Sequence, residues 1–455
     1  METNSLQSND QVQSQYLCTI QRFWSSFNIP TILNRCRIRK AKGFAAKDIF
    51  HTLFALPFLG MNFYNGVIDN KDVPYGKDAV YEFLKCSTFN WRKFLLVLAV
   101  QLVAFLEKLT SNKREKVLII DDSTLGRLRS KKVELLARVF DHCENKFLKG
   151  YRMLSVCWSD GASFLPLDFA LLSSANEKNR IQGITKDLDK RCCGYKRRME
   201  AMTKSTDLLE PMVSRILSLG VKARYVLMDS WFAMPKTIAG LRKHIHVVCM
   251  VKKTPKILYE YLGKQYTLEG IYRLLKKRPG RAKILASTVV SMKYGGQAKI
   301  VFVRDKRKKD WLALLTTDID QPNEEVVRIY GKRWDIEVFF KMSKQHLGLE
   351  KNIQTRDFDS QIAYTSIVMA RYMFLAVEQR RRDDPRTFGR LFQACCKEMK
   401  DLSFLEALKR ILELVVDKLR KAGEYTEQIY KALISAIFGT AIEFFQLDKQ
   451  LCQRT

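Results

Sequence analysis

The chain has 455 residues, with 79 Lys and Arg against 48 Asp and Glu, and therefore a formal net charge of +31. Hydrophobic residues make up 47% and aromatic residues 11%, which is enough for packed cores and excludes a disordered polycation. The longest apolar stretch, Phe94 to Leu106, is shorter than the roughly 20 residues that span a membrane. The first residues lack the basic and apolar segments of a secretory signal. We therefore expect a soluble, intracellular protein without a membrane partner that binds a large polyanion.

Cysteine usage predicts the same compartment. The 11 cysteines form no CxxC motif, and the adjacent pairs Cys192-Cys193 and Cys395-Cys396 lack the spacing of a zinc knuckle. The sequence has 5 histidines and no HExxH motif. We predict reduced thiols and no structural zinc site.

Residues 1–110 have apolar residues at helical spacing and are predicted to be a helical N-terminal region. Basic residues precede and separate these segments, notably Arg35, Arg37, Arg39, Lys40 and Lys42. Two interpretations stay open: a small DNA-binding module, or a helical cap on the next domain.

Residues 111–251 change to short apolar runs, such as KVLIIDD, SFLPLDFALLSS and ARYVLMDSWF, separated by helical segments. This alternation predicts an α/β sheet with crossover connections. Residues 252–320 carry closely spaced strand candidates and predict a β-rich insertion. Helical periodicity resumes over 321–350 and continues through 351–455, which we predict to be a helical C-terminal region and a candidate for dimerisation.

Acidic residues end two of the predicted strands. KVLIIDD ends in Asp121 and Asp122, and YVLMD ends in Asp229. In open α/β sheets, functional sites collect at the carboxyl ends of strands. Adjacent strand residues project to opposite faces, so only one of Asp121 and Asp122 can point toward a shared site, and spacing alone does not say which.

A helical segment after the insertion carries four polar residues on one face. Tyr330, Arg333, Glu337 and Lys344 fall within about 60° at the helical period. Taken alone, this face has two interpretations: a solvated surface with an Arg–Glu pair, or part of a site.

These features occur in an order that is typical of a known family. Asp229 follows Asp122 by 107 residues, and Glu337 follows Asp229 by 108. With IIDDST, YVLMDSWF and the Tyr-x2-Arg-x3-Glu-x6-Lys signature, the chain resembles the DDE transposases of the insertion-sequence-four family, the group that includes the transposon-five enzyme. The resemblance covers roughly residues 110–350, and the helical ends match only in general character.

The resemblance implies an α/β fold, with a ribonuclease-H-like catalytic core that a β-rich insertion interrupts and helical regions flank. The family's first acid directly precedes Ser or Thr, which implies Asp122, followed by Asp229 and Glu337, as catalytic residues and metal ligands. Two carboxylates 4 Å apart repel by about 4 kcal/mol at an effective dielectric of 20, so such a cluster needs cations. Hard oxygen ligands suit two Mg²⁺ ions, or Mn²⁺.

The implied activity is cut-and-paste transposition, with cleavage at transposon ends and strand transfer into target DNA. The implied partners are double-stranded DNA, as terminal inverted repeats and target, and a second copy of the chain in a synaptic homodimer. The implied location is the bacterial cytoplasm, on the nucleoid. Two alternatives are a metal-dependent ribonuclease-H-like nuclease or resolvase, and an inactive DNA-binding protein descended from a transposase.

The resemblance also implies DNA contacts. Tyr330, Arg333 and Lys344 are expected to hold the terminal phosphate and displaced strand, and Trp311 to stack on a flipped-out base. We place Trp334 in the core. Two basic clusters are expected to follow DNA phosphates: Lys190, Arg191, Lys196, Arg197 and Arg198, and then Arg304, Lys306, Arg307, Lys308 and Lys309.

Overall fold

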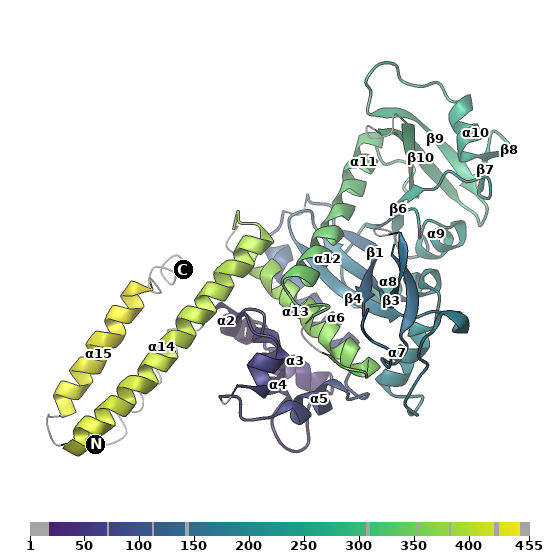
Figure 1. Ribbon diagram of the computed structural model, residues 1–455. Coiled ribbons are helices and arrows are strands. Elements are labelled where there is room, and N and C mark those ends of the chain that lie inside the picture. The colour runs from purple at the N-terminus through teal and green to yellow at the C-terminus, as the bar shows by residue number, and fades with distance from the viewer. Residues whose placement is uncertain are drawn as a thin grey trace.

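The computed structural model describes residues 18–445 except 71, 112, 142–144, 306–309, 352–353, 382–383 and 423–426. Figure 1 shows a central sheet with helices on both sides, a group of N-terminal helices beside α13 (Phe358–Arg381), and a C-terminal hairpin of two helices that projects from the body. This mixed α/β architecture is consistent with the predicted ribonuclease-H-like fold.

The N-terminal helices pack into the same hydrophobic core as the sheet. An aromatic cluster joins Phe54 and Phe58 to Phe374 of α13, with ring centroids 6.0 and 5.5 Å apart. Asn90 caps the longest of these helices by accepting a hydrogen bond from the backbone of Lys93. The helices are α2 (Thr19–Ser26), α3 (Ile29–Arg35), α4 (Ala46–Ala55), the π-helix η1 (Tyr64–Ile68), α5 (Lys77–Leu84) and α6 (Trp91–Lys108).

A buried arginine also links the N-terminal helices to the rest of the chain. Arg371 of α13 donates to the carbonyls of Leu53 and Phe54, near the end of α4, and to that of Leu347. The last carbonyls of a helix have no partner within the helix, so a buried helix end needs such donors. Arg371 therefore holds α4 and the segment after the signature helix together.

The described part of the chain forms one 11-stranded sheet, in the order β2-β3-β1-β5-β6-β11-β10-β9-β7-β8, with β4 paired to β3. Strands β1, β5 and β6 are parallel, whereas β3 is antiparallel to β1, β2 and β4. The first strands are β1 (Val117–Gly126), β2 (Ala137–Asp141), β3 (Lys146–Ser159), β4 (Phe164–Leu172), β5 (Tyr225–Met228) and β6 (His246–Val251).

The strand β1 is longer than predicted. The sequence predicts that it ends at the acid pair, but pairing with β3 continues through Asp122, opposite Leu154, to Gly126, opposite Gly150. Asp229, in contrast, directly follows the last residue of β5, as expected for a strand that ends in an acid. The long antiparallel partner β3 accounts for the difference, because it keeps β1 extended after the parallel neighbour β5 has ended.

The region between β6 and the signature helix is built on the edge of the same sheet. Strand β11 is antiparallel to β6, with Ala313 opposite Val251, so the sheet is continuous. The division of the chain into domains remains a prediction. The elements are β7 (Leu258–Tyr261), β8 (Lys264–Thr267), α10 (Leu268–Leu274), β9 (Ile284–Met292), β10 (Gln297–Asp305) and β11 (Asp310–Thr316).

Helices cover both faces of the sheet. Trp158 of β3 donates to the carbonyl of Lys222, beyond α8, whereas its neighbour Ser159 donates to Asp335 of α12 on the other face. Because consecutive side chains of a strand point to opposite faces, these two contacts show that α8 and α12 lie on opposite faces of the sheet. These helices are the 3₁₀ turn η2 (Glu177–Asn179), α7 (Cys193–Ala201), α8 (Ser205–Ser218), α9 (Pro235–Leu241), α11 (Asn323–Gly331), the 3₁₀ turn η3 (Lys332–Trp334) and α12 (Asp335–Gln345).

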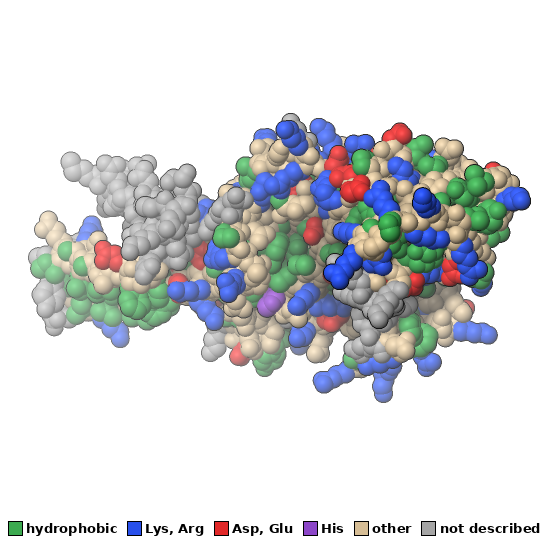
Figure 2. All heavy atoms as spheres, turned by 90° about the horizontal axis from the view of Figure 1, so that it is seen from above, with side chains coloured by type: hydrophobic (Ala, Val, Ile, Leu, Met, Phe, Trp, Pro, Cys, Tyr) green, Lys and Arg blue, Asp and Glu red, His purple; other side chains and the backbone are tan. Residues whose placement is uncertain are grey.

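The projecting hairpin consists of α14 (Phe388–Ala422) and α15 (Glu427–Phe444). Figure 2 shows hydrophobic side chains in green along the hairpin. Its exposed large apolar side chains are Phe404, Ile411, Leu414, Val415, Ile429, Leu433 and Phe444. Among the described residues, every helix is too short or too polar to cross a bilayer.

Candidate active site

The two strand acids that lie side by side are Asp121 and Asp229. The parallel register of β1 and β5 aligns Ile120 with Met228, and the next residue on each strand is an aspartate. The negative charge of Asp229 acts on Asp121, where it raises the pKa of the Asp121 carboxyl. These two carboxylates therefore share the carboxyl edge of the parallel strands, where functional sites of α/β sheets collect.

Arg333 connects this strand edge to the acid on the helix. One of its amino groups lies 2.8 Å from Asp121 Oδ2, and the other lies 3.1 Å from Glu337 Oε1. The side chains of Asp121 and Glu337 are 18% and 46% exposed. Asp121, Asp229, Arg333 and Glu337 thus form one acidic group with a guanidinium inside it.

The environment of Asp121 favours its neutral form. Burial raises the pKa of Asp121 to about 7, and Asp229 and Asp122 also raise it, while the Arg333 guanidinium and the Asp122 amide lower it. The carboxyl therefore titrates near neutral pH. A perturbed carboxyl beside a second carboxyl and an arginine, at a sheet edge, is typical of a functional site.

Asp122 points to the opposite face of β1. Its carboxylate lies 3.2 Å from Arg152 of β3, which also donates to the carbonyl of Phe140. The family pattern implies Asp122 as the first acid, but the structure brings Asp121, not Asp122, to Asp229 and Glu337. The reason is the period-two alternation of a strand, which gives opposite directions to adjacent side chains.

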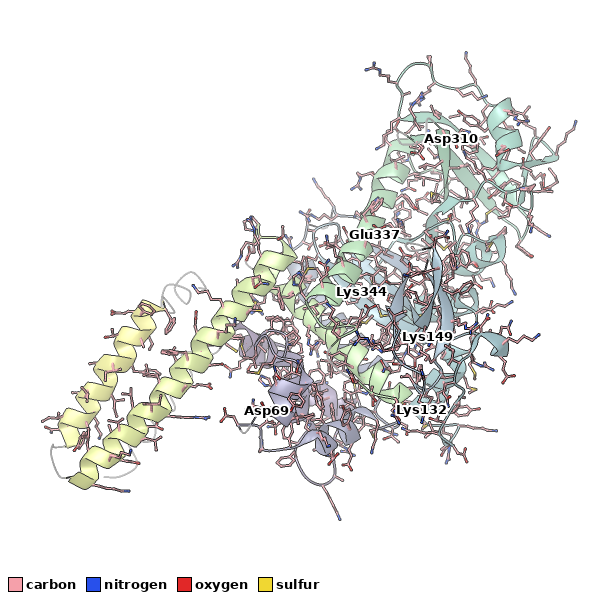
Figure 3. All side chains as sticks on the ribbon, in the orientation of Figure 1. Asp69, Lys132, Lys149, Asp310, Glu337 and Lys344 are labelled. Carbon is pink, nitrogen blue, oxygen red and sulfur yellow. The ribbon has the colours of Figure 1, made fainter. Side chains whose placement is uncertain are left out.

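The signature residues lie on a helix that is interrupted by η3. Arg333 and Tyr330 are close, with the guanidinium carbon 6.0 Å from the ring centroid. Lys344 lies further along α12, on the same helix as Glu337 (Figure 3), with its ammonium 2.5 Å from the Thr124 carbonyl and 3.3 Å from Glu350. Tyr330, Arg333 and Glu337 are therefore together, whereas Lys344 attaches α12 to a later part of β1.

The donor groups suit a hard divalent cation, because Asp121, Asp229 and Glu337 offer carboxylate oxygens. Within the described ranges, however, no three His, Cys, Asp or Glu side chains are arranged to hold a metal ion. Arg333 lies between Asp121 and Glu337 instead. A cation shared by these two carboxylates thus requires the Arg333 side chain to move away from one of them.

Residues 67–287 match the family model of the DDE superfamily endonucleases. The match supports a DDE transposase-type family and a transposase- or nuclease-type function. It includes Asp121, Asp122 and Asp229 and ends before Glu337 and the signature helix. No curated protein matches the chain.

Trp311, the residue expected to stack on a base in a DDE transposase, packs inside an aromatic cluster at the start of β11. Its ring lies 4.6 Å from that of Tyr272, in a stacked arrangement, and 5.1 Å from that of Phe302. The ammonium of Lys253 lies 3.9 Å from the Trp311 ring centroid. Base stacking by Trp311 therefore stays a prediction, and a base would have to share the ring with these neighbours.

Two of the arginines expected to contact DNA are buried. Arg198 forms charged hydrogen bonds to Glu134 and Asp359, at 2.8 and 2.9 Å, and is fully inaccessible. Arg197 donates to the Phe169 carbonyl and pairs with a glutamate at 3.3 Å. The prediction that Arg197 and Arg198 bind DNA is therefore wrong, because Arg197 is buried against β4 and Arg198 is buried between Glu134 and Asp359.

The remaining members of the basic clusters are on the surface. Lys190, Arg191, Lys196 and Arg304 are exposed, and Lys306, Arg307, Lys308 and Lys309 lie outside the described residues. Figure 2 shows Lys and Arg side chains spread over the viewed face, with fewer acidic ones between them. This face is electrostatically suited to a polyanion.

Two tryptophans near the site, Trp334 and Trp231, are exposed, which the sequence did not predict. Trp334, which we placed in the core, is 54% exposed, and the Arg333 guanidinium lies 5.4 Å from its ring. Trp231, two residues after Asp229, is 43% exposed and was not selected from the sequence. The motif YVLMDSWF contains it, but only the fold shows that its ring reaches the surface beside the acids.

Proposed function

We propose that this protein is a DDE transposase that cuts DNA at transposon ends and joins the released ends to target DNA. The observation that carries the proposal is the register of β1 and β5, which places Asp121 beside Asp229, with Arg333 linking Asp121 to Glu337. We assign Asp121, in place of Asp122, as the first catalytic carboxylate, with Asp229 and Glu337 as the others.

Asp121, Asp229 and Glu337 would hold two Mg²⁺ ions, or Mn²⁺. When bound, such a pair activates the attacking oxygen and stabilises the leaving oxygen of an in-line displacement at phosphorus. The first nucleophile is water, which releases a 3′-OH, and that 3′-OH is the nucleophile of strand transfer.

Arg333 has two partners in this proposal. Without bound cations its guanidinium offsets the repulsion between Asp121 and Glu337. If cations were bound to the carboxylates, the guanidinium would be available for the terminal phosphate, which it can hold with two parallel hydrogen bonds. Tyr330 lies against Arg333 and orients it. We propose that the Lys344 ammonium contacts phosphates of the DNA backbone near β1.

The proposed partners are the element's terminal inverted repeats, target DNA and a second copy of the chain. The exposed apolar row on α14 and α15 supports a homodimer, since such a surface is a candidate for burial against another protein. The proposed location is the bacterial cytoplasm, on the nucleoid. The net charge of +31 supports an association with DNA.

A metal-dependent DNA nuclease is the second candidate function. The description of the matched family as endonucleases favours it. A nuclease would cut without joining ends. An inactive DNA-binding descendant is a third outcome, which the presence of all three acids makes the weakest.

Cleavage of the element's own flanking DNA tests the proposal. We expect the full-length protein to excise a segment bounded by the flanking inverted repeats from a supercoiled plasmid in Mg²⁺ or Mn²⁺, and to insert it into a second plasmid. Excess EDTA should abolish both steps. Cutting without insertion would indicate the nuclease, and binding without cutting would indicate the inactive descendant.

DNA affinity should depend strongly on salt. A fluorescein-labelled 30-base-pair duplex of arbitrary sequence is expected to bind tightly at 50 mM NaCl and at least ten-fold more weakly at 200 mM, because log K falls by about 0.9 per phosphate neutralised for each unit of log[salt]. Fluorescence anisotropy measures the slope. An affinity that is independent of salt would contradict phosphate binding by the basic surface.

A further inference from the structure

A buried serine lies directly opposite Asp121 in the sheet. The antiparallel register of β1 and β3 pairs Asp121 with Ser155. Directly opposite residues of neighbouring strands point to the same face, with Cβ atoms about 4.5–5.5 Å apart. Ser155 is completely buried. Its hydroxyl is therefore held inside the protein, next to the first carboxylate of the proposed site.

The hydroxyl of Ser155 has no hydrogen-bond partner among the described residues. Buried polar side chains are nearly always hydrogen-bonded, and one that is not requires an explanation, such as a role in catalysis. Ser159, on the same face of β3, shows the usual arrangement, because its hydroxyl donates to Asp335 at 3.0 Å. Ser155 thus keeps a donor beside Asp121 that the fold itself does not use.

The Asp121 carboxylate faces the same side of the sheet as this hydroxyl. Cys157, two residues after Ser155 on β3, is fully buried, and both its burial and the charge of Asp121 raise the pKa of its thiol. Residues two apart on a strand point to the same face. Ser155 and Cys157 therefore lie on the face where Asp121 meets Arg333.

Both carboxylate oxygens of Asp121 accept hydrogen bonds in the structure. Oδ1 accepts from the backbone N–H of Asp122 at 2.8 Å, and Oδ2 accepts from the Arg333 guanidinium at 2.8 Å. A cation shared with Glu337 requires Arg333 to move away from one of the two acids. If Arg333 leaves Asp121, Oδ2 loses its donor, although only 18% of the side chain is exposed. Carboxylates that bind metal ions are themselves held by hydrogen bonds, so a replacement donor is needed.

We propose that Ser155 is a positioning residue, whose hydroxyl donates to the Asp121 carboxylate when Arg333 has released it and holds that carboxylate in the orientation that binds the cation. This assignment rests on the proposed function. An ionised carboxylate has about four lone-pair sites, so Asp121 can accept from the Asp122 amide and from Ser155 and still bind a cation. Ser155 acts only through Asp121.

Mn²⁺ binding to the full-length protein tests this role without relying on DNA cleavage. Electron paramagnetic resonance detects free Mn²⁺ and gives the affinity, and Asp121→Asn identifies the part of the binding that belongs to the site. We expect Ser155→Ala to weaken this part by about ten-fold or more, because loss of a residue that orients a metal ligand commonly lowers metal affinity by about 10- to 100-fold.

Thermal stability distinguishes this role from a structural one. Because the Ser155 hydroxyl has no partner among the described residues, Ser155→Ala should melt at or slightly above the temperature of wild type when no metal is added. A serine that only supports the fold would give a lower melting temperature together with any loss of binding.

Two further variants isolate the hydroxyl. Ser155→Thr keeps it, whereas Ser155→Val replaces it with a methyl group in a side chain of the same shape, so crowding in the core affects both variants alike. We expect the Thr variant to bind Mn²⁺ at least about five-fold more tightly than the Val variant.

Ser360 provides a matched control. It is also buried, and its hydroxyl has no partner within the described ranges. It lies on α13, next to the Asp359 that pairs with Arg198, and therefore belongs to a different ionic cluster. Ser360→Ala should leave Mn²⁺ binding unchanged.

The outcomes separate the role of Ser155 from the proposed function. Wild-type Mn²⁺ affinity of Ser155→Ala, or equal affinities of the Thr and Val variants, would overturn the positioning role while the carboxylate site stands. If Ser155→Ala fails to fold, the comparison of Thr with Val decides. Mn²⁺ binding that Asp121→Asn does not reduce would overturn the proposed metal site and the role of Ser155 together. Plasmid cleavage by the wild-type protein tests the proposed function separately.

Discussion

Asp121→Asn is expected to abolish metal-dependent DNA cleavage, whereas Asp122→Asn should retain most of it. Asp121 lies in register with Asp229 and is hydrogen-bonded to Arg333, which also binds Glu337, while Asp122 faces Arg152 on the other side of β1. Mutation of a residue that only hydrogen-bonds a metal ligand commonly lowers metal affinity or activity by about 10- to 100-fold. Removing a ligand itself should therefore lower the cleavage rate by at least about 100-fold.

Plasmid cleavage in Mg²⁺ measures this difference, with Asp229→Asn and Glu337→Gln as the expected equivalents of Asp121→Asn. Duplex binding should persist in all of these variants, because it depends on the basic surface. Asp122→Asn leaves Arg152 without its carboxylate partner, so its melting temperature must be compared with that of wild type. Full loss of cleavage in folded Asp122→Asn, together with normal cleavage in Asp121→Asn, would restore Asp122 as the first acid.

Arg198→Met is expected to destabilise the fold strongly. Arg198 is buried between Glu134 and Asp359, and Glu134 also accepts backbone hydrogen bonds from Thr185 and Phe358. Removing the arginine leaves two buried carboxylates without their main cation. Breaking a buried ion pair in this way costs about 3–5 kcal/mol of unfolding free energy.

Arg191→Ala is the matched control for this prediction. Arg191 lies on the same basic segment and pairs with Asp189, but its side chain is 92% exposed. Thermal melting should show a clear drop for Arg198→Met and none for Arg191→Ala. If Arg198→Met melts like wild type but loses duplex affinity, the DNA-binding interpretation of Arg198 is restored.

Much of the site could be predicted from the order of its motifs. The predictions of Asp229 and Glu337 depend on local sequence patterns. Asp229 is an acid that directly follows an apolar strand segment, and Glu337 lies on a helical face with Tyr330 and Arg333. Their catalytic role stays a proposal. In the structure Asp229 directly follows β5, and Glu337 is connected to Asp121 through Arg333. The strand that carries the first acid was also predicted, although its end was placed too early.

The rest could not be predicted, because it depends on partners that are distant in sequence. Arg198 belongs to a basic run, and nothing local distinguishes it from Lys196. Its burial comes from Glu134 and Asp359, which lie far away along the chain. The exposure of Trp231, two residues after Asp229, likewise shows only in the folded chain.

The sequence by itself determined the net positive charge, the acidic residues available for catalysis and the helix that carries the third of them, since composition and spacing are properties of the chain alone. Only the tertiary structure shows which of Asp121 and Asp122 lies beside Asp229 and Arg333. That choice depends on the register between β1 and β5 and on the reach of Arg333, and both arise when strands and helices pack. Adjacent side chains of a strand point to opposite faces of the sheet, and only tertiary packing determines against which face the helix lies.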